Sequence, residues 1–191
     1  MKTRRVKGNR FCALGILCAK EEKGSFGGAY DRLEWPYLKA VMLKLGVSPR
    51  FTETIMRCVS SVSFSVLFNG GILDAFRPSR GLRQGDPISP YLFLLAAEGL
   101  SCLLKAQEEG VRGVSVAATA PTVNHLLFAD DSLLFFEATT ESAARVKELL
   151  KRYCDASGQR INTDKSSIYF SKGVPDTLRD EVKGVLQVNN E

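Results

Sequence analysis

Hydrophobic positions change their period several times along the chain, and each change predicts an element. Apolar residues at helical spacing, with proline or serine at the start and glycine at the end, predict helices. Alternation with a period of two around turn residues predicts strands and hairpins. The predicted helices cover about 36–46, 48–60, 89–108, 139–157 and 175–186. The predicted strands and hairpins cover about 11–19, 62–76, 113–117, 122–137 and 161–170.

This order of elements predicts an α+β fold, in which antiparallel hairpins form a sheet and helices pack on one face. The chain has 191 residues, of which 45% are hydrophobic and 25% charged, so it can build the core of one domain or of part of one. No stretch of 18 apolar residues exists, because Glu98 interrupts the longest run, 91–104. The sequence therefore predicts no membrane span and no membrane partner.

The positive charge is concentrated at one end of the chain. The first ten residues hold five of the 26 basic residues and no acidic one, so the rest of the chain carries 21 of each sign. The net charge of +5 is therefore only a weak indication of nucleic-acid binding. A basic segment before the apolar residues 11–19 is also typical of a secretory signal, but we favour a tail that leads into a buried strand.

Cysteine spacing supports a location inside the cell, in the nucleus or cytoplasm, over secretion. The five cysteines are scattered and include no C-x-x-C pair, which is typical of reduced thiols and not of a disulfide framework or a zinc site.

The first candidate for chemistry is the pair Asp130-Asp131, at a tight turn between two apolar runs that the pattern predicts to be fully buried. Two adjacent carboxylates are disfavoured in such a place unless a divalent cation neutralises them. A solvated turn is the alternative, because aspartate is a common turn residue.

A second candidate is the loop GLRQGDPISPYLF at 81–93, where glycines allow close approach of a ligand to the backbone. Arg83 can bind phosphate through its guanidinium, and Gln84 can hydrogen-bond a base or sugar edge. An ordinary loop before a helix is the alternative.

Three further residues have a simple structural alternative. Tyr30, in AYDRLEW at 29–35, belongs either to a site or, with Trp35, to the core. Lys165, in GQRINTDKSS at 158–167, lies on or beside the last strand, where most lysines are only solvated. His125 is the only histidine and alternates with apolar neighbours, so we expect a hydrogen-bonded strand residue and not a catalyst.

Four motifs in this order, AYDRLEW, GLRQGDPISPYLF, FADDSLLFF and GQRINTDKSS, resemble the reverse transcriptase domain of LINE-type (non-LTR) retrotransposons. The resemblance covers about residues 30–172. It implies the α+β palm of a right-hand polymerase, with its fingers and thumb largely missing from this chain. The expected division is a basic tail and divergent segment over 1–28, a palm-like domain over 29–172, and a remnant of the connection toward the thumb over 173–191.

The resemblance also implies roles for single residues. Asp130 and Asp131 match the pair that binds two Mg²⁺ ions in the family, and Lys165 matches a lysine that can protonate the leaving pyrophosphate. Tyr30 matches the aromatic residue that excludes a ribose 2′-hydroxyl. Gln84 and Gly85, together with Arg83 beside them, match the loop that meets template and nucleotide. The implied partners are an RNA template, a DNA primer and deoxynucleoside triphosphates.

One position departs from the family pattern. The family has another catalytic aspartate five residues before the aromatic residue, at the end of a strand, and counting back from Tyr30 leads to Ser25. Serine supplies no charge to hold two metal ions together. We therefore expect weak or absent polymerase activity. The alternatives are a non-catalytic nucleic-acid-binding remnant and a relic without a selected role.

Overall fold

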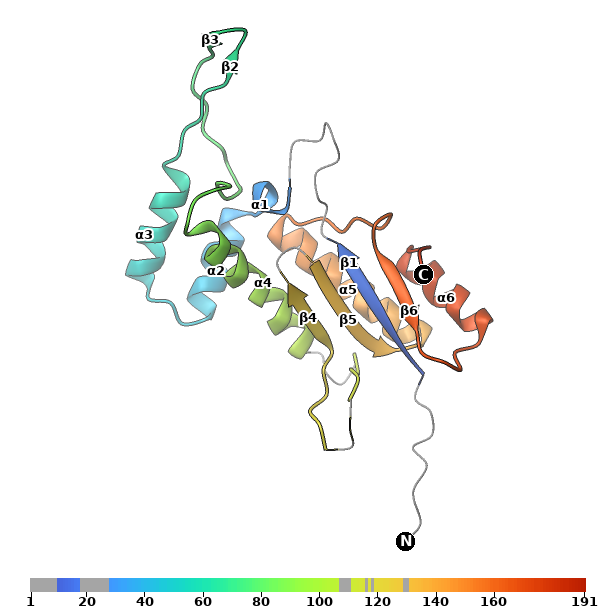
Figure 1. Ribbon diagram of the computed structural model, residues 1–191. Coiled ribbons are helices and arrows are strands. Elements are labelled where there is room, and N and C mark those ends of the chain that lie inside the picture. The colour runs from blue at the N-terminus through green and yellow to red at the C-terminus, as the bar shows by residue number, and fades with distance from the viewer. Residues whose placement is uncertain (1–9, 18–27, 107–110, 116, 118, 129–130) are drawn as a thin grey trace.

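The computed structural model describes residues 10–17, 28–106, 111–115, 117, 119–128 and 131–191 (Figure 1). Four of the described strands form one antiparallel sheet in the order β4-β5-β1-β6. Their bounds are Phe11–Leu17 for β1, His125–Phe128 for β4, Asp131–Glu137 for β5 and Ser167–Phe170 for β6.

The strand predicted after the basic tail is confirmed, and it is central to the sheet. β1 pairs with β5 along its whole length, from Phe11 opposite Glu137 to Leu17 opposite Asp131, and its other edge pairs with β6. Residues 18 and 19, which the prediction also included, lie outside the described residues. The signal-like apolar run is therefore a strand that joins two distant parts of the chain.

The predicted helices are confirmed, with a short additional turn before the first of them. α1 is this turn, Ala29–Arg32. The others are α2 (Trp35–Lys44), α3 (Pro49–Ser60), α4 (Ser89–Lys105), α5 (Thr140–Ser157) and α6 (Asp176–Leu186). Ser48 and Thr139 cap α3 and α5 through their side chains, and Gly158, with a φ of 76°, ends α5 in the left-handed conformation.

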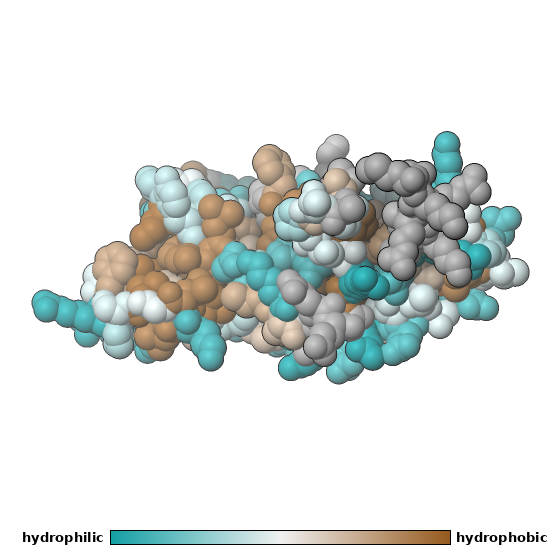
Figure 2. Space-filling view, turned by 90° about the horizontal axis from the view of Figure 1, so that it is seen from below, coloured by the Kyte–Doolittle hydropathy of each residue, from teal (hydrophilic) through white to brown (hydrophobic). Residues whose placement is uncertain are grey.

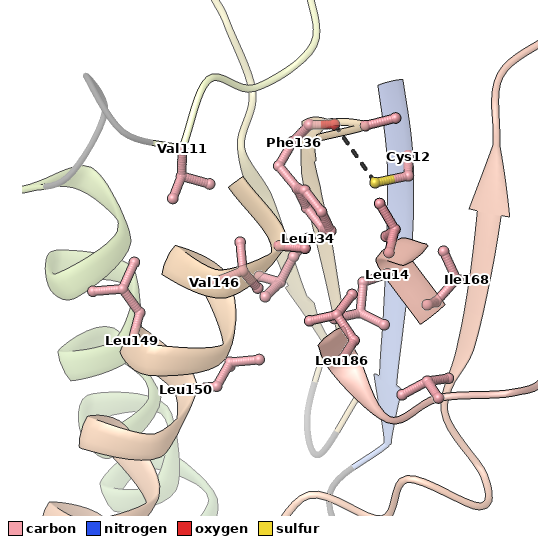
Figure 3. Close-up of a cluster of buried hydrophobic side chains, with 14 of the residues drawn as sticks. Cys12, Leu14, Val111, Leu134, Phe136, Val146, Leu149, Leu150, Ile168 and Leu186 are labelled. Atoms are coloured by element: carbon pink, nitrogen blue, oxygen red, sulfur yellow. Dashed lines mark hydrogen bonds between the residues drawn. The ribbon is translucent and has the colours of Figure 1, made fainter. Parts of the chain in front are cut away.

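Helices cover one face of the sheet, as expected. Cys12 and Leu14 of β1 and Leu134 and Phe136 of β5 point into a buried cluster with residues of α5 and α6 (Figure 3). The other members that Figure 3 labels are Val111, Val146, Leu149, Leu150, Ile168 and Leu186. Burial raises the pKa of the Cys12 thiol to about 12, so this cysteine is a core residue and not a nucleophile.

A second buried cluster lies where α1, α2, α3 and the first half of α4 meet. α4 belongs to both clusters, because Leu92 and Phe93 pack in this one and Leu100 and Leu104 in the first. Hydrophobic side chains also reach the surface at the end of the molecule that carries α2 and α3 (Figure 2). Leu43, Leu45 and Phe51 are the exposed large residues at this turn.

The hairpin predicted at 62–76 is confirmed at its tip, where β2 (Leu67–Phe68) and β3 (Gly71–Ile72) flank the two-residue turn Asn69-Gly70. Both turn residues have positive φ, 48° and 82°. The hairpin projects away from the rest of the protein in Figure 1, and its large side chains are exposed.

Three predictions of strand extent or burial were wrong. The described residues of the segment 113–117 contribute one bridge, Val114 to Val123, because the Ser115 hydroxyl closes a local turn with the carbonyls of Ala117 and Ala120. The strand expected over 161–170 begins at Ser167, because Asn162 Oδ1 accepts the N–H groups of Asp164 and Lys165 in a turn.

The third error concerns the burial of the two strands around the aspartate pair. In β5, Leu134 and Phe136 are buried and the other residues are only partly buried. β4 is not fully buried either. It is an edge strand, and Leu126 and Phe128 point away from the helices with 55% and 81% of their surface exposed.

No helix in the described part of the chain combines the length and the apolar character needed to cross a bilayer. The described cysteines, Cys12, Cys58, Cys102 and Cys154, are free thiols.

Candidate functional site

The α1 turn, which carries Tyr30, is held by the loop that begins at Gly81. The Gly81 N–H donates to the Leu33 carbonyl at 2.8 Å, and the Leu82 N–H donates to the Tyr30 carbonyl at 2.8 Å. The Trp35 indole N–H donates to the Gly81 carbonyl at 2.7 Å. Gly81 has a φ of 89°, and a Cβ there would lie 2.7 Å from the Asp31 carbonyl oxygen, so the contact requires glycine. The first two motifs are therefore neighbours in space.

The fourth motif holds the same turn from another side. The Gln159 side-chain amide donates to the Ala29 carbonyl at 2.8 Å, and the Glu34 N–H donates to the Ser157 carbonyl at 2.9 Å. A Cβ at Gly158 would collide with the Arg32 carbonyl oxygen. Sequence reasoning missed this positioning role of Gly158 and Gln159. A glycine followed by a glutamine at the end of an amphipathic helix is the only signal that the sequence offers for it.

Tyr30 itself is half-buried. Its ring stacks on Phe93 of α4, with ring centroids 4.8 Å apart and planes 14° from parallel. Tyr30 therefore packs on the second cluster, as the core alternative expects, while its side chain stays partly accessible. The position of Tyr30 is fixed by α4, which begins at Ser89, within the candidate motif at 81–93.

Arg83, Gln84 and Gly85 form an exposed turn next to the anchored Gly81. Gly85 has a φ of 84°, and the Asp86 carboxylate accepts the Ile88 N–H at 3.0 Å, which fixes the end of the turn. No ion pair is recorded for Arg83 in the part of the chain that the structure describes. Its guanidinium is therefore available to a ligand.

Asp131 is the first residue of β5, opposite Phe128 of β4 and Leu17 of β1. Its Oδ1 atom is buried and has no hydrogen-bond partner among the described residues. A buried carboxylate oxygen without a partner is unfavourable, and a bound cation would satisfy it. Asp130, the other member of the pair, lies outside the described residues.

Among the residues that the structure describes, the donors around Asp131 do not complete a site for two metal ions. The strand residue opposite it on β1 is Leu17, which has no donor atom. No group of three or more histidine, cysteine, aspartate or glutamate residues that could hold a metal ion occurs within the described ranges. Ser25, which the count back from Tyr30 indicated, lies outside them. One carboxylate therefore fits a cation, while the described set does not fit a magnesium pair.

Lys165 is exposed, two residues before β6, and Asn162 accepts its backbone N–H. The position beside the strand agrees with the expectation, and no side-chain partner is recorded for Lys165 within the described ranges.

His125 is hydrogen-bonded, as expected of a structural residue. Its Nδ1 atom lies 2.6 Å from Asn124 Oδ1, and its Nε2 atom lies 2.9 Å from Ser101 Oγ of α4. Burial, followed by the charge of Lys105, lowers the pKa of His125. The neutral imidazole therefore links β4 to α4.

The sheet and its helices define the palm fold of a right-hand polymerase. Telomerase from Candida tropicalis, in a form truncated from its C-terminal domain, matches with a TM-score of 0.63 and 16% identity over 88% of this chain and 32% of that chain. Telomerase from Candida albicans, in complex with a fragment of telomeric RNA, gives a TM-score of 0.61 and 14% identity over 87% of this chain and 27% of that chain.

Residues 25–184 match the family described as "Reverse transcriptase (RNA-dependent DNA polymerase)", and the chain belongs to this family. An uncharacterized mitochondrial protein of Arabidopsis thaliana is 55% identical over 124 residues, which are 59% of this chain and 94% of that protein.

Two transposon proteins are similar over a larger part of this chain. The Xenopus laevis transposon TX1 protein is 29% identical over 81% of this chain, and the Drosophila melanogaster Pol polyprotein of a type-2 R2 retrotransposable element is 26% identical over 77%. The chain spans only 11% and 13% of these two proteins. It is a reverse transcriptase domain of the non-LTR type, as its four motifs predicted.

Proposed function

We propose that this chain is a palm-like reverse transcriptase domain that has lost most or all of its polymerase activity. The observation that carries the proposal is the register of β1, which brings Leu17 opposite Asp131. Residues directly opposite each other on neighbouring antiparallel strands have Cα atoms about 4.5–5.5 Å apart. Position 17 is therefore where a carboxylate could share a metal ion with Asp131.

The loss of that carboxylate explains weak activity in physical terms. Two divalent ions held about 4 Å apart repel strongly, and anionic ligands between them offset the repulsion. Leucine offers neither charge nor lone pair. Asp130 and Asp131 keep a capacity for Mg²⁺, but without a third carboxylate we expect weak occupancy.

The register also changes where the missing ligand belongs. Leu17 precedes Tyr30 by thirteen residues, whereas the family spacing is five, and this difference led the count to Ser25. Because β1 occupies the strand next to Asp131, we assign the missing ligand to position 17. The residues between Leu17 and Ala29 are then the divergent stretch.

The remaining assignments follow the family. An RNA template, a DNA primer and deoxynucleoside triphosphates are the proposed partners, with Arg83, Gln84 and Gly85 near template and nucleotide. Tyr30 would exclude the 2′-hydroxyl, with its ring fixed by Phe93. Lys165 would lie near the triphosphate and protonate the leaving pyrophosphate. We propose no membrane partner.

The division of the chain and its location are also proposals. The boundaries 1–28, 29–172 and 173–191 stand as predictions, and the place of β1 in the sheet favours starting the palm-like unit at Phe11. We favour the nucleus or cytoplasm. The name of the Arabidopsis relative adds the mitochondrion as an alternative.

Primer extension on an RNA template with magnesium tests the proposal. We expect no extension above background by the natural chain and measurable extension by Leu17→Asp. Removal of the neighbouring carboxylate by Asp130→Ala in the Leu17→Asp background should abolish it. Mn²⁺ binding, measured by electron paramagnetic resonance, should tighten in Leu17→Asp independently of any turnover.

Ser25→Asp is the matched control, because it adds the same charge at the position that the count indicates. Extension by Ser25→Asp alone would favour the count over the strand register. Extension by the natural chain above the level of Asp130→Ala would contradict the proposed loss of activity.

A non-catalytic nucleic-acid-binding role is the second candidate. It is favoured by the exposed Arg83 and Gln84 on a loop that Gly81 anchors rigidly to α1. Such a role needs no metal pair, and it predicts salt-dependent binding without turnover.

A further inference from the structure

A cavity of about 580 Å³ lies between the end of α3, the base of the β2–β3 hairpin and the loop at 78–84. Its volume is within the range of small-molecule binding sites. One wall is aromatic and consists of Phe64 and Phe76. These two residues exchange backbone hydrogen bonds of 2.9 and 2.8 Å, and their ring centroids are 5.9 Å apart. The backbone pairing therefore holds two aromatic rings at the mouth of the hairpin.

A second part of the lining, the cationic wall, comes from the loop at 78–84. It contains Arg80, Arg83 and Gln84. Arg80 is paired with Glu34 at 3.3 Å and stays half exposed, whereas no ion pair is recorded for Arg83 in the described part of the chain. Among the described residues, Asp31 is the only carboxylate that lines the cavity, and its Oδ2 atom already accepts the Gly28 N–H at 3.1 Å. The free charge that faces a ligand is therefore positive.

We propose that this cavity holds one unpaired nucleotide of a single-stranded RNA, with its base against Phe64 and Phe76 and a phosphate on Arg83. Aromatic rings beside a cationic groove are the combination that binds single strands without sequence preference. Gln84 can hydrogen-bond the edge of the base or the sugar. A base inside a duplex is stacked and paired, so it cannot enter.

Two features of the structure support this occupant over an apolar one. Phe76 keeps 52% of its surface exposed, so its ring is not used by the core. Arg83 lines the same cavity and has no recorded ion pair in the described part of the chain, so it would leave an apolar partner facing uncompensated charge. The proposal rests on the proposed reverse transcriptase function, because that function supplies the RNA.

Fluorescence anisotropy with a short labelled single-stranded RNA tests the aromatic wall. Phe64→Leu combined with Phe76→Leu keeps the apolar volume and removes the stacking surface, so we expect affinity to fall about 10- to 100-fold. Phe51→Leu is the matched control, because Phe51 is an exposed phenylalanine at the other end of α3, and it should leave binding unchanged. Phe76→Trp, which keeps an aromatic surface, should retain binding and shows that the hairpin tolerates substitution.

The cationic wall is tested separately. Arg83→Gln should weaken binding and lower the slope of log affinity against log salt by about 1. Arg152→Gln, at an exposed arginine of α5, should do neither. Duplex RNA of the same sequence should not respond to the phenylalanine variants.

The double leucine variant decides the proposal. Unchanged affinity for single-stranded RNA in that variant would overturn the pocket assignment and leave the reverse transcriptase proposal intact. Absence of any RNA binding by the natural chain would overturn the pocket too. The polymerase proposal would then be decided by extension in Leu17→Asp.

Discussion

Two hairpins in the part of the chain that the structure describes, β2–β3 and β4–β5, have a similar sequence pattern and different surroundings. Both alternate apolar residues around a two-residue connection, Asn69-Gly70 in one and Ala129-Asp130 in the other. In the β4–β5 hairpin, Leu134 and Phe136 are fully buried. In the β2–β3 hairpin, Leu67, Phe68 and Ile72 are 63–77% exposed.

A third strand accounts for the difference. β5 pairs with β1, and α5 covers the face that results, whereas β2 and β3 pair only with each other in the described part of the chain. A two-stranded hairpin alone is marginal in water, and three strands with a covered face are needed for stability. Alternation along the sequence therefore predicts a hairpin but not its burial.

We expect the largest difference in stability between the two hairpins from Phe136→Ala. The side chain is fully buried between β5 and the helices, so its removal leaves a cavity and should cost about 3–5 kcal/mol of the free energy of unfolding. Phe68→Ala in the other hairpin should change it by less than about 0.5 kcal/mol. Urea denaturation followed by circular dichroism measures both, and equal losses would show that the β2–β3 hairpin is also part of the core.

β1 shows which part of the fold can be predicted from the sequence and which part cannot. The apolar run at 11–19 predicts a strand, but its partners are more than 100 residues away, and no local pattern encodes their register. The register is what brings Leu17 to Asp131, so counting residues back from Tyr30 led to a different position. Helices were easier to predict, because Ser48, Thr139 and Gly158 give local start and stop signals.

The second expected effect concerns the loop that joins the exposed hairpin to the core. Gly81→Ala combines a left-handed φ with a collision against the Asp31 backbone, and we expect a loss of about 2–4 kcal/mol in the free energy of unfolding. Gly85→Ala is the matched control in the same loop. It has a similar φ but nothing within 4 Å, so it should cost about 1 kcal/mol.

Urea denaturation measures the free energy of unfolding of both variants. If Gly81→Ala and Gly85→Ala lose similar amounts, backbone strain explains the loss and the collision with Asp31 does not. The anchoring of the hairpin to α1 through Gly81 would then be wrong.

The candidate site was predictable where residue chemistry is local. Arg83 and Gln84 stand out because a guanidinium and an amide group lie in a loop rich in glycine and proline, and the aspartate pair stands out in the sequence because two carboxylates interrupt apolar runs. The stacking of Tyr30 on Phe93 and the hydrogen bond from Gln159 to Ala29 were not predictable, because they join residues 63 and 130 positions apart. Ordinary apolar or amide residues become positioning residues only through the fold.

The third effect is a pH dependence in the β4–β5 hairpin. Burial lowers the pKa of His125 below its ordinary 6.5, so near and below that pH the unfolded chain binds the proton more readily than the folded one. The stabilisation by the neutral ring is complete above about pH 6.5 and is lost as the pH falls through the lowered pKa.

Because Lys105 and Glu98 act on the ring in opposite directions and the ring is only partly buried, we expect a smaller change than in the variants above. His125→Gln should flatten the stability profile below pH 6.5, measured by denaturation across pH. An unchanged slope would assign the pH dependence to other groups.

The smallest effect is expected at the tip of the exposed hairpin. Gly70 has a φ of 82°, and a Cβ added there would meet nothing within 4 Å, so Gly70→Ala strains the turn without any collision. Because the β2–β3 side chains contribute little to either buried cluster, the free energy of global unfolding should change by less than about 0.5 kcal/mol. Amide exchange of the residues around Asn69 should nevertheless become faster, since the local ladder is the structure that the turn supports. A large global loss in this variant would mean that the hairpin is coupled to the core, and the two hairpins would then differ in exposure only and not in their contribution to stability.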